Sequence, residues 1–471
     1  MPEQNLAWYK GITRYQWLVL TIASLGWVFD VFEGQIFVAS MREAMPELLG
    51  LVVGHEDVMR WSNLAFASFL LGGAFGGVAF GVLSDKIGRS STMIVTILFY
   101  SLFTCVTAFA QEAWHMVALR FLVAMGVGGE WAVASAMVAE VMPKRSRPIM
   151  SSIFHGSSVF GTLLAAAAGA FVVGNPALGE SAWRWGFAIG VVPACLTLFV
   201  RWKLKEPEQW VRARELGKTD RAQQTGKISH LFQGEHLRSI LVGVSLASIG
   251  LVTFWGGHIY GKNVLLRHAQ QVVLDEEGIA EGASNEVKQA AFALHKSELK
   301  RAEMLSMVLN TIGGGLGLVL FGTISNRIGR RGAFIFYHAI AFVMMILLFM
   351  VLVPSNAPAL VLAITLPIFG FFTLGMHAGY AVYFPELFPT RLRGTGAGFC
   401  FNMGRLATAA AFVFFAYLPD LLENDALMLS SEFKTMMLTP ESKAIMLSPL
   451  YLVGCVVVLF GRETRDQELP E

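Results

Sequence analysis

The sequence predicts an all-α membrane protein with twelve transmembrane helices in two pseudo-symmetric six-helix halves. The chain of 471 residues is 55% hydrophobic and only 15% charged, whereas a soluble domain carries about 25% charged residues. Apolar stretches of roughly 18 residues or more, the length that crosses a bilayer, recur along it. Two motifs also recur in the same order at an offset of about 240 residues, which indicates an internal repeat.

The repeated motifs define the two halves. Gly-Val-Leu-Ser-Asp-Lys-Ile-Gly-Arg at 81–89 returns as Gly-Thr-Ile-Ser-Asn-Arg-Ile-Gly-Arg-Arg at 322–331. A Glu-x-x-Pro-x-x-x-Arg motif begins at Glu140 and again at Glu386. Two membrane-embedded copies of one unit that enclose a site are typical of secondary transporters.

The first half is expected to cover residues 1–203. Its first apolar span, roughly 17–40, is too long for the core of a signal peptide and lacks a clear cleavage site. Asp30 and Glu33 interrupt the middle of this span. Five further spans follow at about 61–84, 91–110, 114–139, 150–173 and 184–203.

A polar linker rich in lysine and arginine, residues 204–237, separates this half from the second, residues 238–471. The second half has spans at about 238–260, 304–325, 332–353, 358–383, 394–418 and 444–460. Two outer segments, 261–303 and 419–443, interrupt it. Residues 284–303 are rich in helix formers, which predicts either a solvated helical cap or an extension of the next span.

Lysine and arginine concentrate in alternate connectors, which indicates the orientation of the chain. The basic connectors share a side with both termini and include Lys86, Arg89, Arg391 and Arg393. The alternate connectors are poor in basic residues or rich in acidic ones. We therefore expect both termini and the linker to be cytoplasmic, with the protein in the plasma membrane (cell inner membrane).

The motif at 81–89 resembles the signature of the major facilitator superfamily, which that family carries between its second and third helices. This resemblance implies that both copies, with the two Glu-x-x-Pro-x-x-x-Arg motifs, lock and release the halves. The gating residues are then Gly81, Asp85, Lys86, Arg89, Glu140, Arg147, Gly322, Asn326, Arg327, Arg330, Glu386 and Arg393.

Physical chemistry agrees with a gating role for the first copy. Gly81 permits close helix contact, and Asp85 can pair with a basic side chain or with free N–H groups at a helix end. The alternative is a basic connector that only fixes topology. Ser90 replaces a second basic residue usual in the family. Asn326 stands where the second copy often has Asp, so we expect the second lock to be weaker.

The resemblance extends over nearly the whole chain. Arg120-Phe121 followed by Gly-Val-Gly-Gly-Glu-Trp at 126–131 resembles the fourth-helix signature of the metabolite and carboxylate:proton symporters, the sialate and lactate type. Residues 205–210 and 461–465 resemble the motifs that follow helices six and twelve. These matches indicate the superfamily strongly but do not identify a substrate.

Charged residues inside the spans are the candidates for transport chemistry, because they are costly there and usually line a water-filled path. Asp30 and Glu33 are three residues apart and share one helix face. Glu130 lies near mid-depth of the fourth span, and Arg120 lies about 10 residues before it, nearer the outer side. Arg405 lies near the middle of the eleventh span.

These residue types suit the binding of a proton and an anion. Burial favours the neutral form of an acid, which can then take up and release a proton near neutral pH. Arginine stays charged, and its fork fits a carboxylate. We assign proton coupling to Asp30, Glu33, Glu130 and Arg120, and substrate binding to Arg405. The alternative is that these acids form ion pairs or hydrogen bonds that only hold helices together.

Aromatic residues beside the charges complete the expected substrate site. Trp27, Phe29 and Trp131 are the candidates, whereas aromatics at span ends are usually interfacial anchors. A lone histidine in an apolar helix is commonly a hydrogen-bonded packing residue. Three histidines are therefore ambiguous, of which we include the last in the site: His155, His258 and His377.

Together these features predict a secondary active transporter that works by alternating access and carries a small carboxylate or related metabolite with protons. A sugar or polyol:proton symporter is an alternative, because the motif at 461–465 is shared with sugar porters. A neutral polyol would not need Arg405 or Arg120 and would favour Asn and Gln in the cavity. A non-transporting membrane receptor on the same scaffold is a third hypothesis.

The sequence indicates neither an enzyme nor a cofactor. It contains no GxxxxGK[ST] loop for a nucleotide, no nucleophile triad and no metal-ligand spacing. Its four cysteines lie in apolar segments, as is typical of small core residues, and a net charge of +2 gives no reason to expect nucleic acid. The expected partners are a small organic anion, protons and the lipid bilayer, and the oligomeric state stays open.

Overall fold

The structure is a computed structural model and describes residues 7–52, 55–173, 175–179, 181–195, 200, 202–220, 223–280, 282–423 and 440–471. Every regular element in these residues is a helix. The first bundle and the linker contain α1 (Arg14–Leu49), α2 (Glu56–Ile87), α3 (Arg89–Thr107), α4 (Ala113–Val141), α5 (Arg147–Gly156), α6 (Ser158–Ala168), η2 (Gly169–Val173), η3 (Pro176–Leu178), α7 (Ala182–Ala188), η4 (Ile189–Cys195), α9 (Glu208–Thr219) and η6 (Ile228–Phe232).

The second bundle is built from the remaining helices. They are α10 (Gly234–Thr253), η7 (Phe254–His258), α11 (Ile259–Gly261), α12 (Val264–Glu276), α13 (Asn285–Leu294), α14 (Lys296–Ile346), η8 (Leu347–Leu352), α15 (Ala359–Gly375), α16 (Ala378–Tyr383), η9 (Phe384–Leu387), η10 (Thr390–Leu392), α17 (Arg393–Glu423), α19 (Pro440–Leu447) and α20 (Pro449–Leu459).

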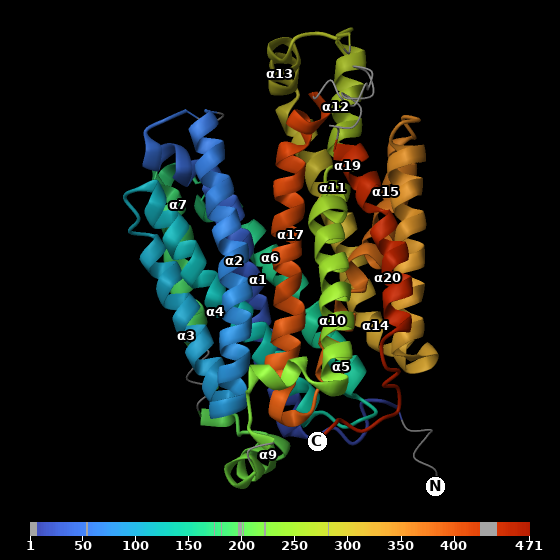
Figure 1. Ribbon diagram of the computed structural model, residues 1–471. Helices are drawn as coiled ribbons and strands as arrows, with labels where there is room; N and C mark the ends of the chain where they lie inside the picture. The colour runs from blue at the N-terminus through green and yellow to red at the C-terminus, as the bar shows by residue number, and fades with distance from the viewer. Residues whose placement is uncertain are drawn as a thin grey trace.

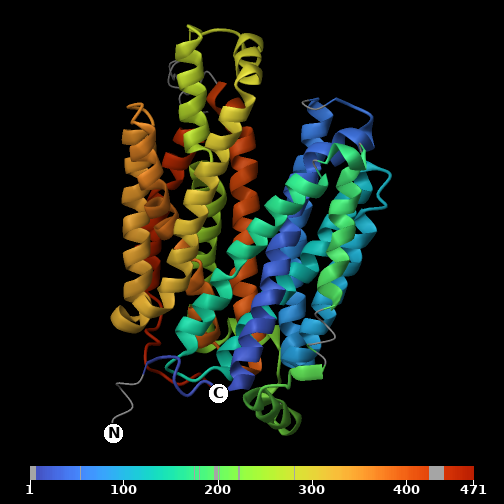
Figure 2. The same cartoon turned by 180° about the vertical axis from the view of Figure 1, so that it is seen from behind.

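The two bundles stand side by side with their helices roughly parallel to one long axis (Figure 1, Figure 2). The beginning of α1, the end of the chain and α9 all lie at one end of this axis, which we call the terminal end. The helices α12 and α13 project beyond the other end, the distal end. At the terminal end α5 of the first bundle packs against α14 of the second.

Nine helices in the described part of the chain are long and apolar enough to cross a membrane. The longest, Lys296–Leu352, is broken at Gly329 and contains the predicted spans 304–325 and 332–353. The predicted span 394–418 lies within α17. The predicted span 184–203 includes residues outside the described part, and so does the outer segment 419–443, of which residues 424–439 are not described.

The first outer segment contains helix over much of its length. The seventh span runs on beyond residue 260 through α11 into α12, and α14 begins at Lys296 rather than near residue 304. Between them α13 packs on a small apolar core of its own, centred on Val273, Ala291 and Leu299. Residues 284–303 therefore form both a separate cap helix and an extension of the next span.

The repeated motif has the same backbone in both copies. Gly88 and Gly329 adopt positive φ angles of 112° and 82° between consecutive helices, a conformation that favours glycine. A side chain at either position would also collide with an acidic side chain, Glu206 or Glu463. The glycine that follows Ile in each copy is therefore required twice, by its φ angle and by its neighbour.

Glycines on α2 allow close contacts within the first bundle and between the two bundles, beside the cavity described below. Gly72 and Gly76 lie against the backbone of α4, and Gly77 lies against Asn402 of α17. Gly73, on the same face as Gly77, leaves space for the side chain of Arg405. Small residues allow such close approach of helices in membranes, and here they let α2 fit between α4 and α17.

Candidate functional site: a gate and a central cavity

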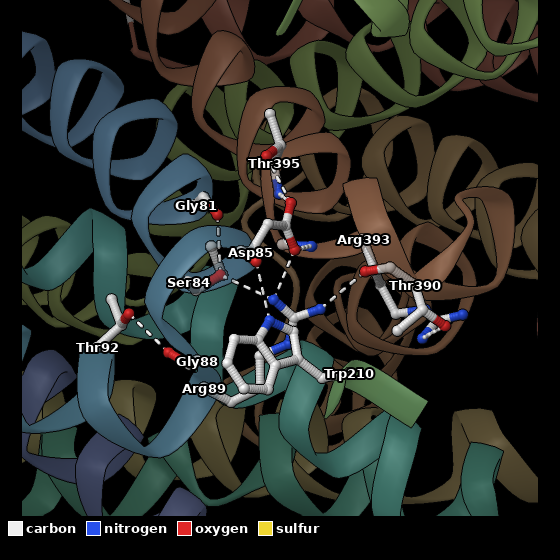
Figure 3. A network of polar contacts seen from close by, with 12 residues as sticks. Gly81, Ser84, Asp85, Gly88, Arg89, Thr92, Trp210, Thr390, Arg393 and Thr395 are labelled. Atoms are coloured by element: carbon white, nitrogen blue, oxygen red, sulfur yellow. Dashed lines mark hydrogen bonds and ion pairs between the residues drawn. The ribbon is translucent and has the colours of Figure 1, made fainter. Parts of the chain in front are cut away.

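Asp85, in the last turn of α2, connects this helix to the first turn of α17 in the other bundle (Figure 3). Its carboxylate accepts hydrogen bonds from the backbone N–H groups of Gly394 (3.1 Å) and Thr395 (2.8 Å) and from the Thr395 hydroxyl (2.5 Å). The first N–H groups of a helix have no acceptor within that helix, and a negative charge there is stabilised by the helix dipole. Asp85 thus caps a helix of the other bundle.

Arg89 extends this contact into a buried ion network. Its guanidinium donates to Asp85 at 2.5 Å, to the two oxygens of Glu140 at 2.8 and 3.2 Å, and to the carbonyl of Thr390 at 3.0 Å. Glu140 also accepts from Arg393 at 2.9 Å. The side chains of all four charged residues are buried, so removal of one would leave another uncompensated.

The linker after the first bundle supports this network. Glu206 accepts hydrogen bonds from the backbone N–H groups of Arg89 (2.6 Å) and Ser90 (3.2 Å), and so caps α3. Trp210 of α9 donates its indole N–H to the carbonyl of Asp85 at 2.9 Å (Figure 3). The residues that resemble the family motif after helix six therefore contact the gate motif directly.

The second copy of the motif forms a related network inside its own bundle. Arg330 donates two hydrogen bonds of 3.0 Å to Glu386 and one of 3.2 Å to the Asn326 side chain. Glu463 accepts from the backbone N–H of Arg330 at 2.9 Å, as Glu206 does in the first copy. Across the bundles, the Asn326 amide donates to the carbonyl of Arg145 at 3.4 Å.

The remaining predicted gate residues divide into buried and exposed ones. Gly81 and Gly322 bring α2 and α14 into backbone contact with α17 and α5, respectively. Arg147 is buried and donates to a carbonyl of α4 at 2.9 Å. Lys86 and Arg327 point to the exterior, so we expect their side chains to contribute to the basic surface of the terminal end.

A cavity of about 180 Å³ lies between the two bundles. Helices α1, α2, α4, α5 and α6 line it from the first bundle, and α10, η7, α14, α15 and α17 line it from the second. The rings of Phe66 and Trp255, from opposite bundles, lie 5.2 Å apart at its wall. Its polar and charged lining residues are Asp30, Gln35, His155, Ser158, Thr162, His258, Lys262, Thr311, His377 and Arg405.

Asp30 and Arg405 face this cavity from opposite bundles with unused hydrogen-bonding capacity. Neither oxygen of Asp30 meets a donor in good geometry among the described residues, although the Tyr100 hydroxyl lies nearby. The guanidinium of Arg405 lies 5.8 Å from the ring centroid of Phe401, and within the described chain its Nη1 has no hydrogen-bond partner. Buried polar groups are normally paired, so these two residues make this cavity the candidate ligand site.

Glu33 and Arg120 form a buried ion pair away from the cavity lining. Arg120 Nη1 donates to Glu33 Oε1 at 2.6 Å, and its Nη2 donates to the Thr107 hydroxyl at 2.7 Å. The guanidinium also lies over the rings of Phe37 and Phe187, at 5.2 and 4.8 Å from their centroids. Glu33 and Arg120 were predicted either to take part in proton coupling or to form an ion pair that holds helices together. The structure shows that they form this ion pair.

Glu130 is also buried outside the cavity lining. It accepts a hydrogen bond of 2.5 Å from the Thr96 hydroxyl on α3, and its other oxygen lies against Gly26 of α1. Glu130 is therefore enclosed among α1, α3 and α4. Of the four residues assigned to proton coupling, the structure brings only Asp30 to the cavity wall.

The predicted aromatic residues lie in three different places. Trp27 lines the cavity and donates its indole N–H to the carbonyl of His155 at 3.1 Å. Trp131 is fully buried behind the lining, where it stacks on Phe401 of the other bundle with centroids 3.9 Å apart. Phe29 faces an apolar groove beside α6 and η4, because neighbouring residues on a helix point about 100° apart.

The three ambiguous histidines all line the cavity. His155 accepts a hydrogen bond from the Trp131 indole at 3.1 Å, and His258 bonds to the Thr373 hydroxyl at 2.7 Å. His377 keeps its Nε2 without a partner among the described residues. His377 therefore combines a position in the cavity wall with a buried ring nitrogen that makes no hydrogen bond to the described residues.

Comparison with known proteins agrees with this architecture. Residues 35–412 match the family described as the Major Facilitator Superfamily. The chain belongs to the major facilitator superfamily. The predicted fold class and the predicted resemblance are confirmed, and as a member of this family the protein is a membrane transporter rather than an enzyme.

Curated relatives in this superfamily align over most of the chain. A probable 4-methylmuconolactone transporter of Cupriavidus pinatubonensis is 27% identical, with 86% of this chain and 85% of the relative covered. The sialic acid transporter NanX of Escherichia coli is 26% identical, with 88% and 89% covered. A cis,cis-muconate transport protein of Acinetobacter baylyi is 26% identical, with 74% and 75% covered.

Solved structures share the fold. The proton:xylose symporter XylE bound to 6-bromo-6-deoxy-D-glucose superimposes with a TM-score of 0.71, at 17% identity, and covers 97% of this chain and 98% of its own. A partially occluded inward-open form of the same xylose transporter from E. coli gives a TM-score of 0.64 at 16% identity. At these identities the similarity establishes the fold of the superfamily.

One charged residue of the cavity was missed by the sequence analysis. Lys262 lines the cavity from just beyond α11. It stands two residues past the predicted end of the seventh span, where a lysine is expected to be a solvated flanking residue. The signal that could have found it is the continuation of helix-forming, apolar sequence after it, from Val264 onward.

Proposed function

We propose that this protein takes up a small organic anion together with protons, by alternating access of the central cavity. The observation that carries the proposal is the pair of opposite charges, Asp30 and Arg405, that face this cavity from opposite bundles with polar atoms that lack a hydrogen-bond partner among the described residues. An arginine fork suits a carboxylate, and an acid beside it suits a proton. In this proposal the terminal end is cytoplasmic, in the inner membrane.

The gate supplies the alternation between the two sides. In the present arrangement the network around Arg89 and the packing of α5 against α14 join the bundles at the terminal end, and in this proposal that contact closes the cavity on the terminal side. Opening toward the cytoplasm requires separation of Asp85 from the first turn of α17.

Coupling follows from the charges of the cavity. A substrate carboxylate bound at Arg405 adds negative charge near Asp30 and so favours the protonated form of Asp30. At Asp30 and Arg405 the charges of one carboxylate and one proton then offset each other, which limits the desolvation cost of the occluded state. We propose Asp30 as the main proton carrier, with the Glu33–Arg120 pair and Glu130 as further candidates.

The relatives support an organic anion as the substrate. The printed names of aligned transporters include sialic acid, cis,cis-muconate and gentisate. The sugar alternative has weaker support from the cavity, since Gln35 is the only Asn or Gln among its described lining residues. The receptor alternative predicts binding without any transport.

Uptake by the purified protein in proteoliposomes tests the proposal. A panel of labelled carboxylates and sugars, with and without an inward proton gradient, should show accumulation of an organic anion only with the gradient. Uptake of a sugar alone would support the rival symporter, and binding without uptake would support the receptor.

Two variants test the assigned roles. Arg405→Gln should weaken anion binding by about 2–5 kcal/mol, the cost of removing one partner of a buried ion pair between Arg405 and the substrate carboxylate. Asp30→Asn should abolish proton-driven accumulation but preserve exchange of internal for external substrate. The corresponding amides of Glu33 and Glu130 are the matched comparisons. The assignment fails if every amide variant still accumulates substrate, or if Arg405→Gln binds anions normally.

Orientation has its own test. A cysteine placed at position 275, in α12, should react with an impermeant reagent from outside intact cells. One placed at position 220, in the linker, should react only after the membrane is opened. The reverse labelling pattern would contradict the proposed cytoplasmic location of the terminal end.

A further inference from the structure

Lys262 is a second cation in the cavity, and the coupling of substrate and proton through Arg405 and Asp30 gives it no role. It lines the cavity just after α11 and is half-buried. Among the described residues its ammonium group has no ion-pair partner, although salt bridges occur at several other places in the same bundle. A charge inside a membrane protein is costly unless it pairs or serves a path, so a negatively charged ligand group would satisfy it.

Arg405 and Lys262 reach the cavity from different depths. Gly404 lies against the backbone of Ala247 and the side chain of Leu251 on α10, which places Arg405 near the level of this turn. Lys262 follows Leu251 by 11 residues of nearly continuous helix, a rise of ~16 Å toward the distal end. The two cations therefore approach a ligand from its two ends rather than sharing one carboxylate.

The charge balance of the site gives the number of anionic groups. With Asp30 protonated in the loaded state and the histidines neutral, the charged residues that line the cavity are Lys262 and Arg405. A monoanion would leave one positive charge uncompensated in the occluded cavity. A dianion would leave none, and a buried ion pair is tolerated best when both charges are matched.

We infer that the substrate carries two anionic groups, one bound by Arg405 and the second by Lys262, which makes Lys262 a specificity-determining residue for a dicarboxylate or a similar dianion. This inference rests on the proposed function and adds the substrate class. The competing role for Lys262 is long-range attraction of any anion to the distal opening, which would act equally on monoanions and dianions.

Matched ligands separate the two roles. The probes are cis,cis-muconate, a dianion at neutral pH, and its monomethyl ester, which keeps the carbon skeleton but loses one charge. Dissociation constants are measured by calorimetry on the purified full-length chain in detergent. The variants are Lys262→Gln, Lys262→Arg and Arg405→Gln. Lys300→Gln is the control for net charge, since Lys300 is largely exposed and pairs with Glu303.

Lys262→Gln is expected to weaken muconate binding at least about tenfold, the effect of losing one hydrogen bond to a charged group, and to change ester binding less than about twofold. Lys262→Arg should restore most of the muconate affinity. Arg405→Gln should weaken both probes. Lys300→Gln should change neither.

Equal weakening of both probes in Lys262→Gln, or of neither, would overturn the dianion assignment. So would wild-type protein that binds the ester as tightly as muconate, or that binds neither while it accumulates a monocarboxylate. None of these results would remove the proposed anion uptake, which fails only if proteoliposomes accumulate no anion. The two proposals can therefore fail separately.

Discussion

The two copies of the gate motif share a backbone but differ in what they do across the molecule. In the first copy, Asp85 accepts three hydrogen bonds from the first turn of α17 in the opposite bundle. In the second copy, Asn326 donates one hydrogen bond of 3.4 Å to the carbonyl of Arg145. One half of the gate therefore joins the bundles through a buried charge, and the other joins them mainly through packing.

The difference lies in both partners of the contact. The first turn of α17 offers Asp85 two N–H groups and the Thr395 hydroxyl. The matching turn of α5 has Pro148, which lacks an N–H group, and Ile149, which lacks a hydroxyl. In the second copy, therefore, the missing carboxylate goes with the loss of two of the three donors that it would need.

Asp85→Asn should have the largest effect, because it gives the first copy the side chain of the second. It removes the charge that caps α17 and leaves Arg89 with one buried acid fewer, a loss of about 3–5 kcal/mol to the closed state. Uptake in proteoliposomes should fall more than about tenfold, while substrate binding is largely kept. Asn326→Ala is the matched control and should reduce uptake much less. If Asp85→Asn loses binding as strongly as transport, its role is not that of a gate.

Glu140→Gln should have the next largest effect and should differ from Glu386→Gln. Glu140 bonds to Arg393 across the bundles, whereas Glu386 bonds to Arg330 within one bundle. Glu140→Gln should therefore loosen the contact between the bundles and increase the reactivity of a cysteine placed in the gate. Glu386→Gln should mainly lower the thermal stability of the protein. The rate of cysteine labelling and the thermal unfolding temperature are measured for both variants. Equal labelling in the two would show that the copies act alike.

Asn326→Asp should have a small effect, because restoration of the carboxylate does not restore two of the three donors that Asp85 has in the first copy. We expect the closed terminal end to gain less than about 1 kcal/mol, the value of a single hydrogen bond. The rate of uptake should change less than about fivefold. A large change would mean that α5 can offer donors as α17 does, and the asymmetry would then lie in the side chain of Asn326 alone.

Lys86→Gln and Arg327→Gln should have the smallest effects. Both side chains are exposed, and exposed substitutions usually change stability by no more than about 0.5 kcal/mol. Each variant should transport at nearly the wild-type rate. A strong loss in only one of them would reveal a contact specific to that copy in another conformation of the gate.

Composition and the internal repeat were enough to predict a membrane protein with two halves. The resemblance of residues 81–89 to the family signature predicted Asp85 and Arg89 as gate residues, and the structure places both in a buried network that joins the bundles. Asn326 already indicated a weaker second copy, because an amide carries no charge to cap a helix. Helical spacing correctly identified Asp30 and Glu33 as residues of one buried face.

Which neighbour each buried charge faces follows from the packing of the helices and not from the spacing of residues along one helix. Asp30 reaches the cavity, whereas Glu33, one turn away, pairs with Arg120, and Phe29 turns toward an apolar groove instead. Lys262 lies two residues beyond the predicted end of the seventh span, and only the packing of the bundles brings it to the cavity. The physical reason is that periodicity fixes the direction of a side chain relative to its own helix, while the helix that stands opposite depends on how the bundles pack.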